Sequence, residues 1–271
     1  MAKINGKTVL FSPVILPIAD GSIENKKLAS YVALPPGCKR LLYLESSQTQ
    51  YINTGVAPVF EVVNGKIVKA TGLKIVAFQP TTGSGVRNLW LGSADNYATG
   101  SIETNGINIF ANAGQRKIEG VYSSVAGTFV TLPENALFNG ELEIKPLSQT
   151  SLGYYHNGVE VSVSGTVAKP FVSISQITPM ILFGLALSSE YDVSTDTFAS
   201  IARLNAGLRI FACEISEYEW NDDSESFVKT IKRNFVPALN AWDYGTVKPG
   251  FFDTVSQRFF YNAGSDEFIY G

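Results

Sequence analysis

The chain has 271 residues, of which 45% are hydrophobic and 17% are charged, and its formal net charge is −3. This composition is typical of a globular protein, and the length suits one large all-β domain. Basic residues occur in short runs such as Lys26-Lys27, which excludes the clustered positive charge of a nucleic-acid-binding surface. No apolar segment has the length of a membrane-spanning helix, so we expect no membrane insertion.

The first 33 residues differ in pattern from the rest of the chain. Asn5-Gly6 is a turn signal within a β-rich segment, and Pro13 and Pro17 then keep the backbone extended. The same prolines interrupt the apolar residues at 8–19, so we expect no cleaved signal peptide. We predict an anchoring and assembly arm over residues 1–33 that lies outside the core and contacts another polypeptide. A folded domain is predicted over residues 34–271.

From Arg40 onward, short segments rich in β-branched and aromatic residues follow one another, separated by Gly, Asn, Ser and Pro. The expected strands are 40–45, 50–55, 59–63, 67–69, 72–79, 87–92, 105–111, 117–122, 127–132, 141–146, 151–156, 159–163, 170–175, 180–187, 207–219, 226–236, 250–253 and 257–261. So many strands without helices predict two stacked antiparallel sheets, each burying one face.

Turn chemistry supports this reading at several positions. Asn64-Gly65 and Asn157-Gly158 each separate two β-segments and predict two-residue type I′ hairpins. Asn105-Gly106 and Asn139-Gly140 are weaker turn signals. The polar segment 188–200 is expected to be an exposed loop.

The two ends of the folded region resemble a known family. Residues 43–55 read YLESSQTQYINTG, and residues 235–271 contain FFYNAGSDEF near their end. Both segments are similar to those of laminin-G-like, concanavalin-A-like jelly-roll domains in gut Bacteroidales bacteriophages and gut bacteria. The resemblance implies a two-sheet jelly-roll sandwich over about residues 34–271. Together with strand spacing it predicts that residues 40–55 pair with 250–270. It also favours a strand at 224–233, where the charges alone would suit a short helix.

Enzymes of this fold are mostly glycosidases or polysaccharide lyases. A retaining glycosidase needs two carboxylates about 5–5.5 Å apart, and residues i and i+2 of a strand project from the same face. Glu141 with Glu143, and Glu217 with Glu219, have this spacing. Because half-buried strands alternate between core and solvent, we interpret both pairs as solvent-facing and predict no enzymatic activity. His156, the single histidine, precedes a hairpin turn and is expected to be exposed.

The sequence predicts no resident cofactor. One histidine and two distant cysteines, Cys38 and Cys213, are too few ligands for a zinc site. Calcium stays open, because laminin-G-like domains often bind it through loop oxygens, and Asp95-Asn96 and Asp192 with Asp196 are loop acids of that type. A bridge between the cysteines also stays open, although Cys213 lies in an apolar pattern typical of a core residue.

Loop aromatics are the candidate ligand-binding residues, since jelly-roll lectins stack aromatic rings on sugars. Large aromatics also close cores and interfaces, which is the competing interpretation. Trp220 lies beside a loop signal. The predicted site consists of Tyr97, Tyr191, Trp242 and Tyr244 with their polar neighbours Asn96, Asp192 and Asp243.

The resemblance implies a non-catalytic bacteriophage virion structural protein, namely a capsid decoration, head-fibre or tail component assembled in the bacterial cytoplasm. In this reading the arm binds other virion proteins, the chain self-associates, and the jelly roll displays a surface for host or mucus glycans. Two alternatives stay open. One is a carbohydrate-binding adhesin module of a gut bacterium, and the other is a glycan hydrolase or lyase.

Overall fold

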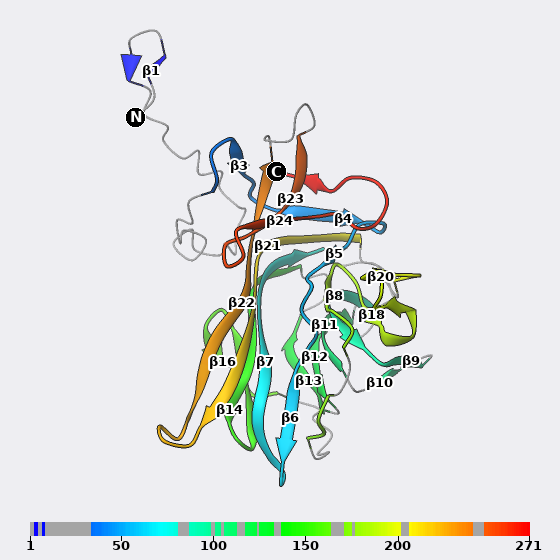
Figure 1. The fold of residues 1–271 in the computed structure, drawn as a ribbon, viewed down its shortest axis with the longest axis vertical. Coiled ribbons are helices and arrows are strands. Elements are labelled where there is room, and N and C mark those ends of the chain that lie inside the picture. Colours follow the sequence, from blue (N-terminus) through cyan, green and yellow to red (C-terminus); the bar gives the residue numbers. More distant parts are fainter. Residues whose placement is uncertain are drawn as a thin grey trace.

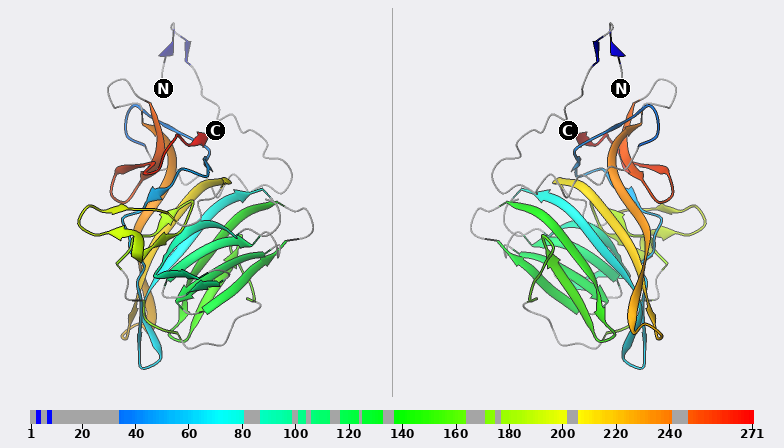
Figure 2. Two further views of the ribbon diagram at one scale, coloured as in Figure 1. Left: turned by 90° about the vertical axis from the view of Figure 1, so that its right-hand side faces the viewer. Right: turned by 90° about the vertical axis from the view of Figure 1, so that its left-hand side faces the viewer.

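The computed structural model describes residues 3–4, 7–8, 34–80, 87–98, 101–103, 106–112, 117–123, 125–132, 137–163, 171–174, 177–201, 206–240 and 247–271. Within these ranges the protein is almost entirely β-structure, with one short 3-10 turn, η2 (Ser188–Glu190), and no α-helix. The strands form two large sheets arranged as a sandwich (Figure 1, Figure 2). This confirms the predicted all-β antiparallel sandwich and is compatible with a jelly roll. The same ranges contain no helix with the length and hydrophobicity of a membrane span.

The large sheet is antiparallel throughout. Its main path is β16 (Val159–Glu160), β15 (Ser151–His156), β14 (Phe138–Ser148), β7 (Lys66–Gln79), β21 (Ala206–Asn221), β22 (Ser226–Asn240), β23 (Lys248–Asp253) and β24 (Arg258–Tyr261). Four strands pair beside this path, namely β3 (Cys38–Arg40), β4 (Leu44–Ser47), β6 (Phe60–Val63) and β25 (Ile269–Tyr270).

The second sheet is smaller and covers one face of the large sheet. Its path is β13 (Val125–Thr131), β12 (Lys117–Ser123), β11 (Gly106–Asn112), β8 (Arg87–Ala94), β17 (Ile181–Leu182) and β5 (Ile52–Asn53), and β18 (Ala186–Leu187) pairs with β8 in parallel. The described residues also form three short hairpins, namely β1 (Lys3–Ile4) with β2 (Lys7–Thr8), β9 (Asn96–Ala98) with β10 (Ser101–Glu103), and β19 (Tyr191–Asp192) with β20 (Thr197–Phe198).

The core lies between the two sheets and follows from the alternation of side chains along each strand. Leu142 and Ile144 of β14 are fully buried in one cluster with Trp90 of β8. The ring of Trp90 packs on Phe138 with centroids 4.9 Å apart. Its indole N–H donates to Gln79 Oε1 (3.1 Å), so its polar atom has a partner inside the core. Truncating a large buried aromatic of this kind costs roughly 3–5 kcal/mol of stability.

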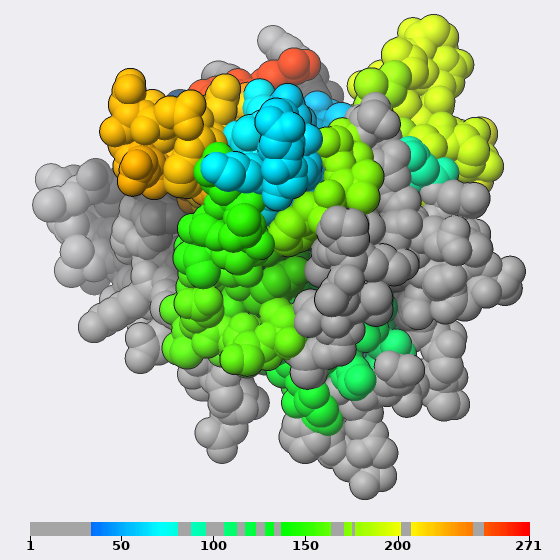
Figure 3. All heavy atoms as spheres, turned by 90° about the horizontal axis from the view of Figure 1, so that it is seen from below, coloured from blue at the N-terminus to red at the C-terminus, as the bar shows by residue number. Residues whose placement is uncertain are grey.

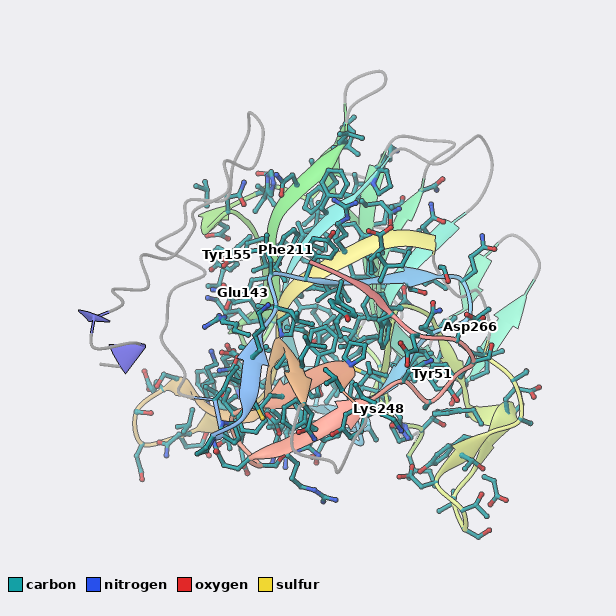
Figure 4. All side chains as sticks on the ribbon, turned by 90° about the horizontal axis from the view of Figure 1, so that it is seen from above. Tyr51, Glu143, Tyr155, Phe211, Lys248 and Asp266 are labelled. Atoms are coloured by element: carbon teal, nitrogen blue, oxygen red, sulfur yellow. The ribbon has the colours of Figure 1, made fainter. Side chains whose placement is uncertain are left out.

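The two matched ends of the chain meet, as predicted. β25 pairs with β4 and places Ile269 opposite Glu45. The backbone N–H of Ala263 donates to the carbonyl of Tyr51 (3.0 Å). In Figure 4 the labelled Tyr51 and Asp266 lie near each other, where the two segments meet. The closing segment is therefore bound along the length of residues 44–51.

The large sheet branches at Phe235. Up to this residue β22 pairs with β21, and the last pair joins Cys213 to Phe235. Beyond it β22 pairs with β23 and β3 instead, and Asn240 lies opposite Cys38. Five residues of strand separate the two pairs, about 16 Å at 3.3 Å per residue. Cys38 and Cys213 accordingly form no disulfide, so the bridge that the sequence left open is absent.

Several predicted strands have different bounds in the structure. The segments 67–69 and 72–79 form one strand, β7, because the chain stays paired through Gly72. The segment 180–187 is divided into β17 and β18 by Phe183, whose φ of +70° breaks the extended backbone. Within 171–174 only an isolated bridge forms, between Ile174 and Phe60. The segment 224–233 is a turn followed by β22, so the helical alternative is wrong.

Two of the predicted turns form hairpins, and a third lies inside a strand. Asn64-Gly65 and Asn157-Gly158 have positive φ at both residues, as type I′ hairpins require. Asn139-Gly140 lies inside β14, so a turn there was a wrong prediction. A Cβ at Gly140 would lie 2.9 Å from Asn157 Oδ1, so glycine leaves room for the side chains of the neighbouring hairpin. The expected loop 188–200 contains η2 and the β19–β20 hairpin.

Most of the predicted arm lies outside the described residues. Ile4 of β1 pairs with Lys7 of β2, and this pairing brackets the predicted turn at 5–6. The domain side of the junction is described, and there Leu34 packs against Val236 and Phe252. Contact between the arm and another polypeptide stays a prediction.

Candidate functional site

The outward-facing surface of the large sheet, which we call the outer face, carries a groove of about 500 Å³. It is lined by Glu143, Lys145, Pro146, Leu147 and Ser148 of β14, by Tyr218 and Trp220 of β21, and by Glu225, Ser226, Phe227 and Lys229 at the start of β22. This volume lies within the range of small-ligand sites, about 300–1,000 Å³. Figure 3 shows this end of the molecule from below, with the β21–β22 turn in orange, the β6–β7 hairpin in cyan and β14–β15 in green beside one another.

Gly72 shapes the floor of the groove. β7 runs between β14 and β21, and Gly72 of β7 pairs with Ser216 of β21. A Cβ at residue 72 would lie 2.3 Å from Cε2 of Tyr218 and 3.3 Å from the carbonyl oxygen of Ile144. Glycine therefore lets the Tyr218 ring lie down across β7.

The aromatic wall is made by neighbouring strands. Trp220 of β21 pairs with Phe227 of β22, and their ring centroids lie 5.2 Å apart at 75°, an edge-to-face contact. Both side chains are half-buried. The indole N–H of Trp220 donates to Asp222 Oδ1 (2.9 Å), which holds the ring in one orientation. A fixed, partly exposed indole is a surface on which a flat apolar group can stack.

Both ammonium groups of the groove lie beside carboxylates. Lys145 Nζ lies 3.1 Å from Glu143 Oε2 and 4.3 Å from the ring centroid of Tyr155. Glu143 and Tyr155 oppose each other on adjacent strands and lie on one side of the molecule in Figure 4. On the other wall, Lys229 Nζ lies 2.7 Å from Glu214 Oε1. These pairs hold the ammonium groups in defined positions.

Tyr218 lies between the two ion pairs and is mostly buried. Burial, followed by the nearby carboxylates of Glu143 and Glu214, raises the pKa of its phenol well above the ordinary value. The phenol is therefore uncharged at neutral pH and can donate or accept a hydrogen bond.

Hydrogen-bonding groups and an aromatic surface thus meet in one groove. Its hydroxyls, carboxylates and ammonium groups can bind several polar groups of a ligand, while Trp220 and Phe227 contact an apolar face. No family model, curated protein or solved structure matches the chain. The function is accordingly argued from this groove.

The predicted loop site is only partly described. Tyr191 and Asp192 lie in β19, where their polar atoms bond within the hairpin. Tyr191 Oη donates to Asp196 Oδ1 (2.9 Å), and Asp192 Oδ1 accepts from the N–H (2.8 Å) and hydroxyl (2.7 Å) of Ser194. Burial and the bond to Asp196 raise the pKa of Tyr191 to about 12, and the Ser194 bonds lower the pKa of Asp192.

Less of the structure is described for the other residues of the predicted loop site. Asn96 and Tyr97 form part of β9, and Ser188 of η2 donates to the carbonyl of the adjacent Asp95 (3.1 Å), so the 95–97 and 188–192 segments are neighbours. The side chains of Asn96 and Tyr97 lie outside the description, as do residues 241–246 with Trp242, Asp243 and Tyr244. This site stays a prediction.

The carboxylate pairs have unequal environments. Glu141 was expected to face solvent but is only 5% exposed, because Lys74 of the adjacent strand reaches its Oε2 at 3.1 Å. Glu217 is bonded by Lys69 at 3.2 Å and by Lys232 at 3.4 Å. Among the described residues, no group of three or more His, Cys, Asp or Glu side chains is arranged to hold a metal ion.

His156 also differs from its predicted environment. It was expected to be exposed, but it is half-buried, with its ring 5.7 Å from that of Phe138. This burial lowers the pKa of His156.

Sequence reasoning considered Trp220 and Glu143 separately and missed the groove that joins them. It also missed Tyr218, Phe227 and Lys229 as lining residues. Alternation along β21 could have indicated Tyr218. Cys213 and Ile215 are buried in the core, so the even-numbered residues that follow on β21 project from the other face of the sheet.

Proposed function

We propose that this chain is a non-catalytic, lectin-like structural protein of a bacteriophage particle that binds glycans in the groove on its outer face. The observation that supports glycan binding is the oriented, half-buried Trp220 beside the charged and hydroxyl side chains of the groove. A pyranose ring has one apolar face and a rim of hydroxyls, which is the combination that such a groove complements.

The particle context of the proposal comes from the resemblance at residues 43–55 and 235–271. The fold supports display, because the groove and the arm junction lie at opposite ends of β22. Phe227 lines the groove, and Asn240 pairs with Cys38 close to the junction. Thirteen residues of strand separate them, about 43 Å at 3.3 Å per residue. In Figure 1 the β14 and β22 hairpin ends and β3 likewise lie at opposite ends of the molecule. An anchored arm would leave the groove exposed.

A single groove of this kind is expected to bind weakly. Aromatic stacking contributes about 0.5–1.5 kcal/mol beyond area burial, by analogy with aromatic pairs. Several copies presented together can raise the apparent affinity by roughly 10²–10⁴. Display on a symmetric particle would supply such copies, and self-association through the arm would do the same.

Glycan binding is tested with the full chain on a glycan array, followed by calorimetric titration of each hit. The proposal predicts that Trp220→Ala lowers the affinity at least about tenfold, a loss of 1.4 kcal/mol. Trp242→Ala, in the alternative loop site, is the matched control and should change the affinity less than about twofold. Circular dichroism checks that both variants fold. If Trp242→Ala abolishes binding and Trp220→Ala does not, the site is the loop and not the groove.

Particle context is tested separately by immunogold labelling of purified phage particles with antibodies against this chain. The proposal predicts labelling of the particle surface. Exclusive labelling of bacterial cell envelopes would contradict it and would favour the adhesin alternative.

A further inference from the structure

The charges of the groove lining cancel. Its lining contains two carboxylates, those of Glu143 and Glu225, and two ammonium groups, those of Lys145 and Lys229. Lys145 is bonded to Glu143 (3.1 Å), and Lys229 is bonded to Glu214 (2.7 Å) beside the groove. The lining therefore carries no net charge, and both of its cations already have anionic partners.

Paired charges still have unused hydrogen-bonding capacity. A carboxylate accepts at about four lone-pair positions and an ammonium donates three hydrogen bonds. The contact between Lys145 and Glu143 uses one position on each side. A neutral hydroxyl can donate to the carboxylate or accept from the ammonium without separating the pair.

A charged ligand meets a different situation. An anion could approach Lys145 only by competing with Glu143, whose carboxylate would then be left without its partner and close to a like charge. The same holds at Lys229, whose anionic partner is Glu214. The arrangement consequently disfavours anionic ligands.

We propose that the groove selects neutral glycans and discriminates against acidic ones such as uronic-acid, sialylated or sulfated oligosaccharides. This inference rests on the proposed glycan-binding function and specifies its ligand class. It also implies that binding depends little on ionic strength, since salt screens interactions between net charges.

The test compares neutral oligosaccharides with acidic derivatives of the same backbone, titrated calorimetrically against the full chain at low and high sodium chloride. Neutral ligands should bind through Trp220, with an affinity that changes less than about twofold with salt. Acidic derivatives should bind at least about tenfold more weakly.

Glu143→Gln provides a gain-of-binding test. It keeps the shape and one acceptor of the side chain but releases Lys145 from its ion pair, so acidic derivatives should gain affinity in a salt-dependent way. Glu217→Gln is the matched control, because it changes the net charge equally but lies outside the groove lining. It should leave acidic derivatives as weak as before.

The possible outcomes separate the two claims. Trp220-dependent binding that prefers acidic glycans, or a Glu143→Gln variant with no gain, overturns the charge selection and leaves glycan binding intact. Absence of Trp220-dependent binding to any glycan overturns the proposed function and the charge selection together.

Discussion

At the scale of single residues, the groove depends on where a side chain is missing. Gly72 pairs with Ser216 as an ordinary strand residue would. The Tyr218 ring, however, occupies the space that a Cβ at residue 72 would need. Small residues in a strand commonly mark such close approaches. Adding a single methyl group at residue 72 should therefore change both the stability of the fold and glycan binding.

Gly72→Ala should lower the free energy of unfolding by about 1–3 kcal/mol, the usual cost of overpacking. It should also weaken glycan binding, because the displaced Tyr218 ring enters the groove. Urea denaturation measures the first effect. In a Tyr218→Ala background the same substitution should cost much less, since the two residues are in contact. Equal costs in both backgrounds would show that Tyr218 is not the obstacle.

The glutamates of the two predicted carboxylate pairs are expected to carry no hydrolytic chemistry. Glu141 and Glu143 share one face of β14, but each bonds a lysine at 3.1 Å. We predict no polysaccharide turnover by the wild-type chain, and hence no change on replacing Glu141, Glu143, Glu217 or Glu219 singly by Gln. Reducing-sugar release over long incubations is the measurement. Cleavage that disappears in one of these variants would identify a catalytic carboxylate and contradict the proposal.

At the scale of elements, the closing of the sandwich depends on a buried amide. Gln50 is fully buried between β4 and the end of the chain. Its Oε1 accepts from the N–H of Ser47 (2.7 Å), and its Nε2 donates to the carbonyl of Glu267 (3.0 Å). One side chain therefore joins the β4 turn to the closing segment.

Gln50→Ala should lower the free energy of unfolding by about 1–3 kcal/mol, because the Ser47 N–H and the Glu267 carbonyl lose their partner and the space of a buried side chain is emptied. Hydrogen exchange should increase selectively at the N–H groups of Ala263 and Ser265, which bond to this segment. Gln257→Ala is the control for the same chemical change. Its amide donates to Thr254 from an exposed turn, so the expected effect is within about 0.5 kcal/mol. Similar losses in both variants would contradict the assigned role of Gln50.

At the scale of the whole molecule, the long strand β22 connects the groove to the arm junction. Its first half forms the wall of the groove with β21, and its last residues pair with β3. Leu34 packs beside this last part, against Val236 and Phe252. The proposed attachment and the proposed glycan binding should therefore be separable by mutation.

Deletion of residues 1–33 should leave a folded domain that no longer self-associates. Light scattering after size exclusion measures the assembly, and thermal melting measures the fold. Trp220→Ala should assemble as the wild type does, because Trp220 pairs with Phe227 at the start of β22, whereas β3 pairs with the other end of that strand. If the truncated chain unfolds, the arm belongs to the core, and the predicted division at residue 34 is wrong.

The sequence by itself determined the features that depend on neighbouring residues. Alternating β-branched and aromatic residues predicted the strands, because each side chain's face follows from its position in the strand. Asn64-Gly65 and Asn157-Gly158 predicted type I′ hairpins, since these residues tolerate positive φ. The meeting of residues 40–55 with the end of the chain was predicted from strand spacing together with the resemblance.

The tertiary structure decided everything that depends on register between distant strands. Glu143, Gly72 and Tyr218 are far apart in the chain, and only the order β14, β7, β21 places them in one groove. The same register brings Lys229 of β22 to Glu214 of β21, whereas Lys145 and Glu143 are neighbours on β14. It also placed Gly140 within a strand, where its lack of a side chain admits a neighbouring hairpin. Local sequence specifies faces and turns, whereas packing of the two sheets selects which faces meet.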